Sequence, residues 1–210
     1  MYNIFIESTC EIIKEEGIKQ VTARKIGDRA GYTSSTIYNY FDELSHLVFF
    51  AAMNFLESYN DELENSLISA KSAREKFFIT WEVFCRHSFH NPDIFYAVFV
   101  SDLGIDPNEL IKRYYQIYEN KIVNYSQEAK FIILEHDLYK RNAILTKELL
   151  RELEIDEKKE SYILQTAILI WQGLLVQIIN NRTDIPPEKC TENYIHLLDE
   201  LIQNLLQSSK

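Results

Sequence analysis

The sequence predicts an all-α protein, and three observations favour that class. Gly and Pro together supply 9 of the 210 residues, about 4%, where globular proteins ordinarily contain about 12%. Three of the five glycines lie within the first 31 residues, and the next 60 residues contain neither Gly nor Pro. Apolar residues recur at helical spacings of three and four through most of the chain. We therefore expect a domain of short helices at residues 1–47 and a larger bundle of long helices at residues 48–210.

The charge balance and the cysteines restrict where the protein works. The formal net charge is −10, so bulk positive charge cannot hold nucleic acid or an anionic membrane, and any polyanion site must be local. Cys10, Cys85 and Cys190 are odd in number and far apart, which favours neither a disulfide framework nor a CxxC metal site. The most apolar stretch, residues 167–179, is shorter than the ~20 residues that a membrane helix needs. With no signal peptide readable, we expect a cytoplasmic protein with no membrane partner.

Three short helices are expected in the N-terminal domain. The first covers about residues 2–16, with its apolar side chains on one face and Gly17 as its stop. Thr22 is suited to cap a second helix, which ends at the Ala-Gly pair of residues 30–31. The third helix covers residues 33–41.

The later helices follow from the same periodicity and from the few Asn and Pro breaks. A long helix over residues 43–66 is expected to connect the two domains. The helices expected after it cover residues 73–91, residues 93–103, a segment that starts at Pro107, residues 130–153 in two pieces, residues 157–180 and residues 188–207.

The last two helices are too apolar for one bundle to cover. The helix at 157–180 is apolar nearly all round from Ile163 to Ile179, and the helix at 188–207 carries a wide apolar stripe. A homodimer through this pair of helices would bury both surfaces. The residues expected at the dimer interface are Leu174, Ile178, Leu198, Leu201, Ile202 and Leu205.

Residues 22–41 have the pattern of a helix-turn-helix, two short helices joined by a tight turn at Gly31. Ile37 and Phe41, at i and i+4, form the buried side of the second helix. Its other face carries hydroxyl and amide groups, which can bond base edges and phosphates in the DNA major groove. The alternative on spacing alone is a plain helical hairpin with a polar outer face.

Several short elements occur together and in register within residues 1–47. They are Glu15-Glu16-Gly17, Val21-Thr22, Arg24-Lys25-Ile26, Arg29-Ala30-Gly31, Ser34 and Thr36-Ile37-Tyr38-Asn39-Tyr40-Phe41. With these elements, residues 1–47 resemble the N-terminal domain of the TetR family of bacterial transcriptional regulators. The resemblance implies an all-helical homodimer whose C-terminal domain binds a small molecule and thereby sets the spacing of two DNA-reading heads. Carried over by position, it implies DNA contacts at Thr22, Arg24, Lys25, Thr33, Ser34, Ser35, Thr36, Tyr38, Asn39 and Tyr40.

The N-terminal domain departs from the family pattern in its charge. Leu44 stands where the family often has a phosphate-binding Lys, and no basic arm precedes the first helix. Residues 1–47 hold five basic and seven acidic side chains, a net charge of −2. Non-specific affinity comes from the counterions that DNA loses when basic side chains neutralise its phosphates. Because this domain is net negative, we expect weak binding to random DNA.

Aromatic residues concentrate between Phe77 and Tyr118, with 11 in 42 residues, about twice the 13% of the whole chain. Such side chains can enclose an apolar or aromatic effector, with tyrosine hydroxyls to orient it, although a packed aromatic core is the alternative. The expected pocket residues are Trp81, Phe84, Cys85, Tyr96, Phe99, Tyr114, Tyr115 and Tyr118, with Trp171 and Gln172 from a later helix.

Three function classes are left open by the residues. The leading hypothesis is a ligand-responsive regulator, a repressor released from its double-stranded DNA operator by a small apolar or aromatic molecule. The second is a helical protein-interaction module that has lost DNA binding, as Leu44 and the acidic head allow. The third, a metal enzyme, has only His87 and His90 in its favour, without a tandem ligand motif or a nucleophile arrangement. We therefore expect no enzyme, no cofactor and no metal.

Overall fold

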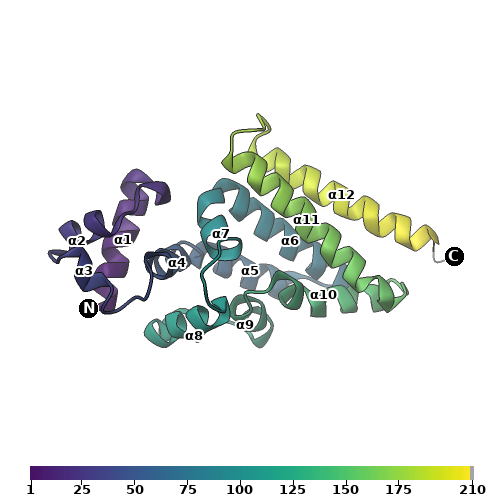
Figure 1. The fold of residues 1–210 in the computed structure, drawn as a ribbon. Coiled ribbons are helices and arrows are strands. Elements are labelled where there is room, and N and C mark those ends of the chain that lie inside the picture. The colour runs from purple at the N-terminus through teal and green to yellow at the C-terminus, as the bar shows by residue number, and fades with distance from the viewer. Residues whose placement is uncertain (209–210) are drawn as a thin grey trace. The chain divides into compact units, whose positions relative to one another are not determined.

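The computed structural model describes residues 1–208 and confirms the all-α class, because the described residues form helices and no strand. Figure 1 shows their order along the chain. The α-helices are α1 (Tyr2–Glu16), α2 (Ala23–Ala30), α3 (Ser34–Ile37), α4 (Leu44–Asn54), α5 (Glu57–Ser69), α6 (Ala73–His90), α7 (Pro92–Phe99), α8 (Pro107–Ile117), α9 (Gln127–Leu134), α10 (Leu138–Glu152), α11 (Glu160–Ile179) and α12 (Pro187–Ser208). Short 3₁₀ helices are η1 (Ile18–Gln20), η2 (Glu119–Lys121) and η3 (Glu157–Lys159).

The chain divides into two compact units that do not follow the boundary expected at residue 47. Unit 1 comprises Met1–Glu57 and Asp93–Val123, and unit 2 comprises Ser58–Pro92 and the described residues from Asn124 onward. The reason lies in α4, whose Leu47, Phe50 and Ala51 are fully buried. Since α4 packs against α1 and against α8, the N-terminal unit extends to both.

The N-terminal three-helix arrangement forms around one apolar core in unit 1. Phe5 of α1, Ile26 of α2, Ile37 of α3 and Phe41 beyond it are all buried. Thr22 caps α2, and its hydroxyl accepts a hydrogen bond from the Lys25 N–H at 3.2 Å. The third helix is shorter than expected, because α3 closes at Ile37 and turns carry the chain on to Phe41.

The single connecting helix expected at residues 43–66 is two helices in the structure, α4 and α5. At the break, the N–H of Phe55 bonds the carbonyl of Ala52 at 2.9 Å, and the N–H of Leu56 bonds that of Met53 at 3.2 Å. These i to i−3 bonds tighten the last turn of α4 and end its α-helical ladder. No Gly or Pro marks this break in the sequence, so the periodicity continues across it.

Unit 2 is built around α6, which packs against α10, α11 and α12. Its core holds Trp81 and Phe84 of α6 with Trp171 of α11, and the ring centroids of Phe84 and Trp171 lie 5.0 Å apart. The Trp171 indole N–H donates to the Ser88 hydroxyl at 2.9 Å. The two-piece helix expected over 130–153 is confirmed as α9 and α10, with Asp137 as the N-cap of the second piece.

The apolar surface of α11 is left partly uncovered. The segment Glu157–Ile179 is long and apolar enough to cross a membrane by length and composition, a test that core helices of soluble proteins also pass. Tyr162, Leu169 and Val176 are exposed at intervals of seven residues, so they follow one stripe of α11. No other part of the described chain covers this apolar stripe of α11.

The expected dimer-interface set has to be corrected on α12. Leu198 and Ile202 have no exposed area and Leu205 is buried, because this stripe of α12 packs inside unit 2. A side chain without accessible surface cannot touch a second copy of the chain. Leu174, Ile178 and Leu201 are half-buried, and contact with a partner stays a prediction for them.

The burial of Leu198 gives a stability prediction. Leu198→Ala should lower the free energy of unfolding by about 2–5 kcal/mol, because the lost methyl groups leave a cavity in a packed core. Ile68→Ala, on the exposed side of α5 where the side chain is 69% accessible, is the matched control and should stay within about 0.5 kcal/mol. Urea unfolding measures both, and an equal loss in the two variants would contradict the assignment of Leu198 to the core.

Candidate nucleic-acid interface

The geometry between α2 and α3 is fixed by two glycines. Gly31 ends α2 in the left-handed region at φ 77°, and the Tyr32 N–H then bonds the Gly27 carbonyl at 2.9 Å. At Gly27, an added Cβ would lie 2.8 Å from the Tyr32 oxygen and 3.0 Å from the Ser34 nitrogen. The backbone at the start of α3 therefore passes directly over α2, at a distance that only glycine permits.

The outward face of α3 is polar and exposed, as the sequence predicts. Ile37 is fully buried, whereas Ser34, Ser35, Tyr38 and Asn39 are exposed, with Tyr38 at 51% of its full accessible surface. The structure thus brings these four side chains together on one surface, which we name the recognition face.

Three further hydroxyl-bearing residues flank the recognition face. The Thr33 hydroxyl lies 2.8 Å from that of Ser35 and 3.0 Å from that of Thr36, so these groups form one hydrogen-bonded cluster. Tyr40 is half-buried, because its ring packs edge-on against Tyr2 of α1 at a centroid distance of 5.4 Å. Only the outer part of Tyr40 is therefore available to a ligand.

The cations of the N-terminal domain are largely neutralised by carboxylates. Lys25 pairs with Glu16 at 2.6 Å, Lys19 pairs with Asp93 at 3.0 Å, and Arg29 pairs with Glu15 and Glu11. The hydrogen bond between Arg29 and Glu15 raises the pKa of the guanidinium and lowers the pKa of the carboxyl. These groups offer little net positive charge to a phosphate backbone.

Arg24 is the exception among the predicted contact residues. Its side chain is 89% exposed, and its nearest carboxylate oxygen, on Asp28, lies 3.7 Å from Nε. Exposed pairs of this kind contribute about 0–1 kcal/mol, so Arg24 can exchange Asp28 for a phosphate at little cost. Leu44, the first residue of α4, is half-buried and adds no charge there.

The ten expected effector-pocket residues fall into two groups. Trp81, Phe84, Cys85 and Trp171 are buried in unit 2, with Gln172 half-buried beside them. The other five belong to unit 1, where Tyr114 packs between Tyr115 and Tyr118 at centroid distances of 5.0 and 4.9 Å. In that unit Phe99 is also buried, and Tyr96 is exposed.

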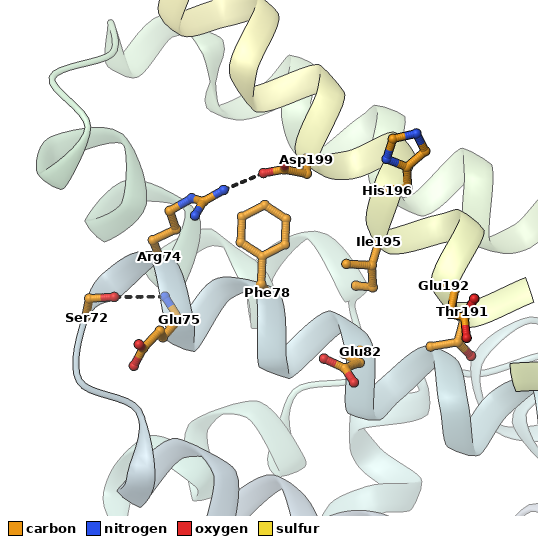
Figure 2. A pocket seen from close by; sticks show the side chains of 10 residues that line it. All are labelled: Ser72, Arg74, Glu75, Phe78, Glu82, Thr191, Glu192, Ile195, His196 and Asp199. Atoms are coloured by element: carbon orange, nitrogen blue, oxygen red, sulfur yellow. Dashed lines mark hydrogen bonds and ion pairs between the residues drawn. The ribbon is translucent and has the colours of Figure 1, made fainter. Parts of the chain in front are cut away.

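Unit 2 has a surface groove between α6 and α12 that the sequence did not indicate. Figure 2 shows Phe78 of α6 between the two helices, with the ion pair of Arg74 and Asp199 at one end. The groove has a volume of about 650 Å³. Its ionisable side chains are four carboxylates, Glu75, Glu82, Glu192 and Asp199, together with Arg74 and His196. No motif predicts it, because its residues come from helices more than 100 positions apart in the chain.

The two histidines considered for a metal site each lie within hydrogen-bond distance of a different carboxylate. His87 lies 2.7 Å from Glu62, and His90 lies 2.9 Å from Glu188. The Arg86 carbonyl and the Glu188 carboxylate raise the pKa of His90. Within residues 1–208, no group of three His, Cys, Asp or Glu side chains is arranged to hold a metal ion.

The chain matches a known family at its N-terminus and known structures over almost its whole length. Residues 5–48 match the family model of the bacterial regulatory proteins of the tetR family. No curated protein sequence matches. FadR of Thermus thermophilus, a TetR-family repressor solved with lauroyl-CoA, has a TM-score of 0.60 at 15% identity and covers 94% of this chain and 93% of its own. RolR, solved with resorcinol, has a TM-score of 0.57 at 16% identity, over 93% and 86% of the two chains.

The family match falls on the three helices that build the recognition face. Residues 5–48 therefore form an N-terminal domain of the tetR family of bacterial regulatory proteins, and the resemblance seen over residues 1–47 is confirmed. The structural similarity shows that the fold of such regulators extends through the C-terminal helices. The protein is a transcriptional regulator with a helix-turn-helix domain.

The close approach at Gly27 yields a prediction. Gly27→Ala should lower the free energy of unfolding by about 1–3 kcal/mol, since the new methyl group forces the α2–α3 backbone apart. Ser35→Ala, on the exposed face of α3, should change it by less than about 0.5 kcal/mol. Thermal and urea unfolding of the two variants tests this, and an unaltered stability of the Gly27 variant would show that the turn can relax.

Proposed function

We propose that the protein is a homodimeric repressor that binds double-stranded operator DNA through the recognition face and is released by a small apolar or aromatic molecule. The observation that carries the proposal is the exposed polar surface of α3, held in place by the buried Ile37 and by the α2–α3 contact at Gly27. A face of hydroxyl, phenol and amide groups suits base edges and phosphates in the major groove. We also propose that it works in the cytoplasm.

Within this proposal, the recognition face supplies sequence specificity and adds little non-specific electrostatic attraction to DNA. Ser34, Ser35 and Asn39 supply donors and acceptors for base edges, and Tyr38 reaches the sugar-phosphate backbone. Arg24 adds a cation from α2. With Lys19, Lys25 and Arg29 paired to carboxylates, affinity depends on direct contacts more than on released counterions.

The dimer we propose forms through the exposed stripe of α11. Tyr162, Leu169 and Val176 repeat every seven residues, the spacing at which two helices pack along a common seam. A two-fold dimer places two recognition faces on one side of B-DNA when their separation is about 34–36 Å. The effector would act by changing that separation.

The effector we propose is small and carries no cluster of negative charge. The structurally similar FadR was solved with lauroyl-CoA and RolR with resorcinol, which are very different in size and charge. In this chain, the four carboxylates of the α6–α12 groove disfavour a ligand with several phosphates. Phe78 and Ile195 in the wall of the same groove suit an apolar or aromatic molecule.

A second candidate function is a protein-interaction module without DNA binding. The observation in its favour is the pairing of the head cations with carboxylates, together with Leu44 at the start of α4. Binding of the purified protein to its own upstream DNA at low and moderate salt separates the two functions. Absence of binding at low salt would favour the second.

The recognition face predicts two DNA-binding defects. Tyr38→Ala and Arg24→Ala should each weaken operator binding by about 1–3 kcal/mol, because each removes a contact to DNA. Arg151→Ala in α10, which removes a guanidinium that is 64% exposed from unit 2, is the control and should bind normally. Fluorescence anisotropy with labelled operator measures all three, and normal binding by both head variants would refute the assigned roles.

Position 44 predicts a gain of affinity. Leu44→Lys should strengthen binding to any DNA and steepen the slope of log affinity against log salt by about 1, because it adds one phosphate contact. Leu44→Gln is the uncharged control and should leave the slope unchanged. If the Lys variant keeps the wild-type slope, position 44 does not face the DNA backbone.

The stripe on α11 predicts a monomeric variant. Leu169→Glu should give a folded monomer, because two carboxylates would meet in the seam, whereas Ile68→Glu on α5 should stay dimeric. Sedimentation velocity at micromolar concentration measures both. A monomeric wild type, or a dimeric Leu169 variant, would contradict the proposed interface.

A further inference from the structure

Unit 1 contains a cavity of its own, with a volume of about 400 Å³, between α1, the end of α4 and η2. This volume lies within the range of about 300–1,000 Å³ typical of small-molecule sites. The cavity shares no residue with the recognition face or with the α6–α12 groove. The wall residues that matter here are Cys10, Lys14, Phe55, Glu57, Tyr118 and Lys121.

Lys14 brings a cation without a carboxylate partner to this cavity. Lys19, Lys25 and Arg29 of the same domain each pair with a carboxylate. Lys14 has no such partner within the described residues, and its ammonium lies 6.0 Å from the centroid of the Phe55 ring. An anion that entered the cavity would therefore find a cation that no other group occupies.

A buried hydroxyl beside the cavity also lacks a partner. Tyr114 is 1% exposed, and its hydroxyl makes no hydrogen bond within residues 1–208. Burial raises the pKa of Tyr114, and Tyr115, Tyr118, Glu57 and Cys10 raise it further. Tyr114 is not itself a wall residue, but its ring packs against that of the wall residue Tyr118 at a centroid distance of 4.9 Å, so the side chain lies directly behind the wall. A buried donor without an acceptor is unfavourable, and a ligand oxygen in the cavity would satisfy it.

Two other polar side chains of the cavity wall, Lys121 and Cys10, already have hydrogen-bond partners. The Lys121 ammonium lies 2.9 Å from the Asn54 side-chain oxygen and 3.1 Å from a Glu57 oxygen, which joins η2 to the end of α4. The Cys10 thiol lies 3.6 Å from the Ala51 carbonyl. Burial raises the pKa of Cys10 to about 11, so the thiol is an uncharged part of the wall at neutral pH.

The charged side chains of the cavity wall limit the negative charge that a ligand can carry. Glu11 is engaged by Arg29 and Glu57 by Lys121, while Glu7 has no ion pair within the described part of the chain. With Glu7, Glu11 and Glu57 against Lys14 and Lys121, the wall has no excess of positive charge, so it repels a dianion, and a single carboxylate depends on direct contact with the Lys14 ammonium. The rings of Phe55 and Tyr118 in the wall suit a flat apolar body.

We propose that this cavity binds a small aromatic carboxylate with a single negative charge. The carboxylate pairs with the Lys14 ammonium, the ring lies against Phe55 and Tyr118, and an oxygen of the ligand accepts a hydrogen bond from the Tyr114 hydroxyl. The site lies in the unit that carries the recognition face and is independent of the proposed effector site in unit 2.

Calorimetric titration of the full-length protein tests the proposal, with benzoate, 4-hydroxybenzoate and phenylacetate as probes. At least one probe should bind tenfold or more tightly than its neutral amide, and phenyl phosphate should bind more weakly than that probe. Lys14→Gln should weaken the bound probe tenfold or more, whereas Lys189→Gln, on an exposed part of α12, should not. Saturable binding by none of the three acids, or equal affinity in the Lys14 variant, would overturn the proposal.

Tyr114→Phe separates a ligand contact from a structural role. Removing an unpartnered buried hydroxyl should raise the Tm of the free protein. The same variant should weaken probe binding, which a purely structural hydroxyl would not do. A raised Tm with unchanged probe affinity would remove Tyr114 from the site.

Cys10 reports occupancy directly, because Cys85 and Cys190 are buried and Cys10 is half-exposed. A bound probe should slow alkylation of Cys10 by iodoacetamide, carried out at alkaline pH because the pKa of this thiol is raised to about 11, and followed by mass spectrometry of the intact protein. Alkylation at the same rate with saturating probe would show that the probe binds elsewhere and would contradict the site. None of these measurements uses DNA, so their failure is distinguishable from failure of the proposed function.

Discussion

The close contact between α2 and α3 is the constraint on which the rest of the N-terminal unit depends. Because the start of α3 rests on the backbone of Gly27, the helix has one available orientation, with Ile37 inward and the polar groups outward. Phe41, just beyond α3, packs edge-on against Phe50 of α4 at a centroid distance of 5.7 Å. The recognition face is therefore connected through packed side chains to α4, and a change in α4 reaches it without a flexible link.

The N-terminal domain differs from a basic DNA-binding protein because it has no excess of positive charge to attract the phosphate backbone. Its cations are mostly held by neighbouring carboxylates, as with Arg29 between Glu15 and Glu11. Such pairs rigidify the surface of α1 and α2 and leave little net attraction for random DNA. Specific contacts then decide where the protein binds. Lys14 is an exception, because it has no carboxylate partner within the described residues. Its side chain lines a cavity and does not belong to the recognition face.

Sequence patterns predicted local structure well and long-range packing poorly. The Thr22 cap, the Gly31 turn and the outward face of α3 depend on neighbours within a few residues, and all are present. The break after Asn54 has no Gly or Pro, so nothing local announces it. Periodicity also showed that Leu198 lies on an apolar stripe but could not say what covers the stripe, which is the core of unit 2. The aromatic residues between 77 and 118 divide between two units for the same reason, since the division depends on contacts made far along the chain.

The most direct test of the central claim is hydroxyl-radical footprinting of the purified protein on the DNA upstream of its own gene. Two recognition faces related by a two-fold axis should protect two half-sites whose centres lie about 34–36 Å apart, or a multiple of that distance, on one side of the duplex. Protection of a single site, or no protection at low salt, would contradict the account of α2 and α3 as a dimeric DNA-reading device.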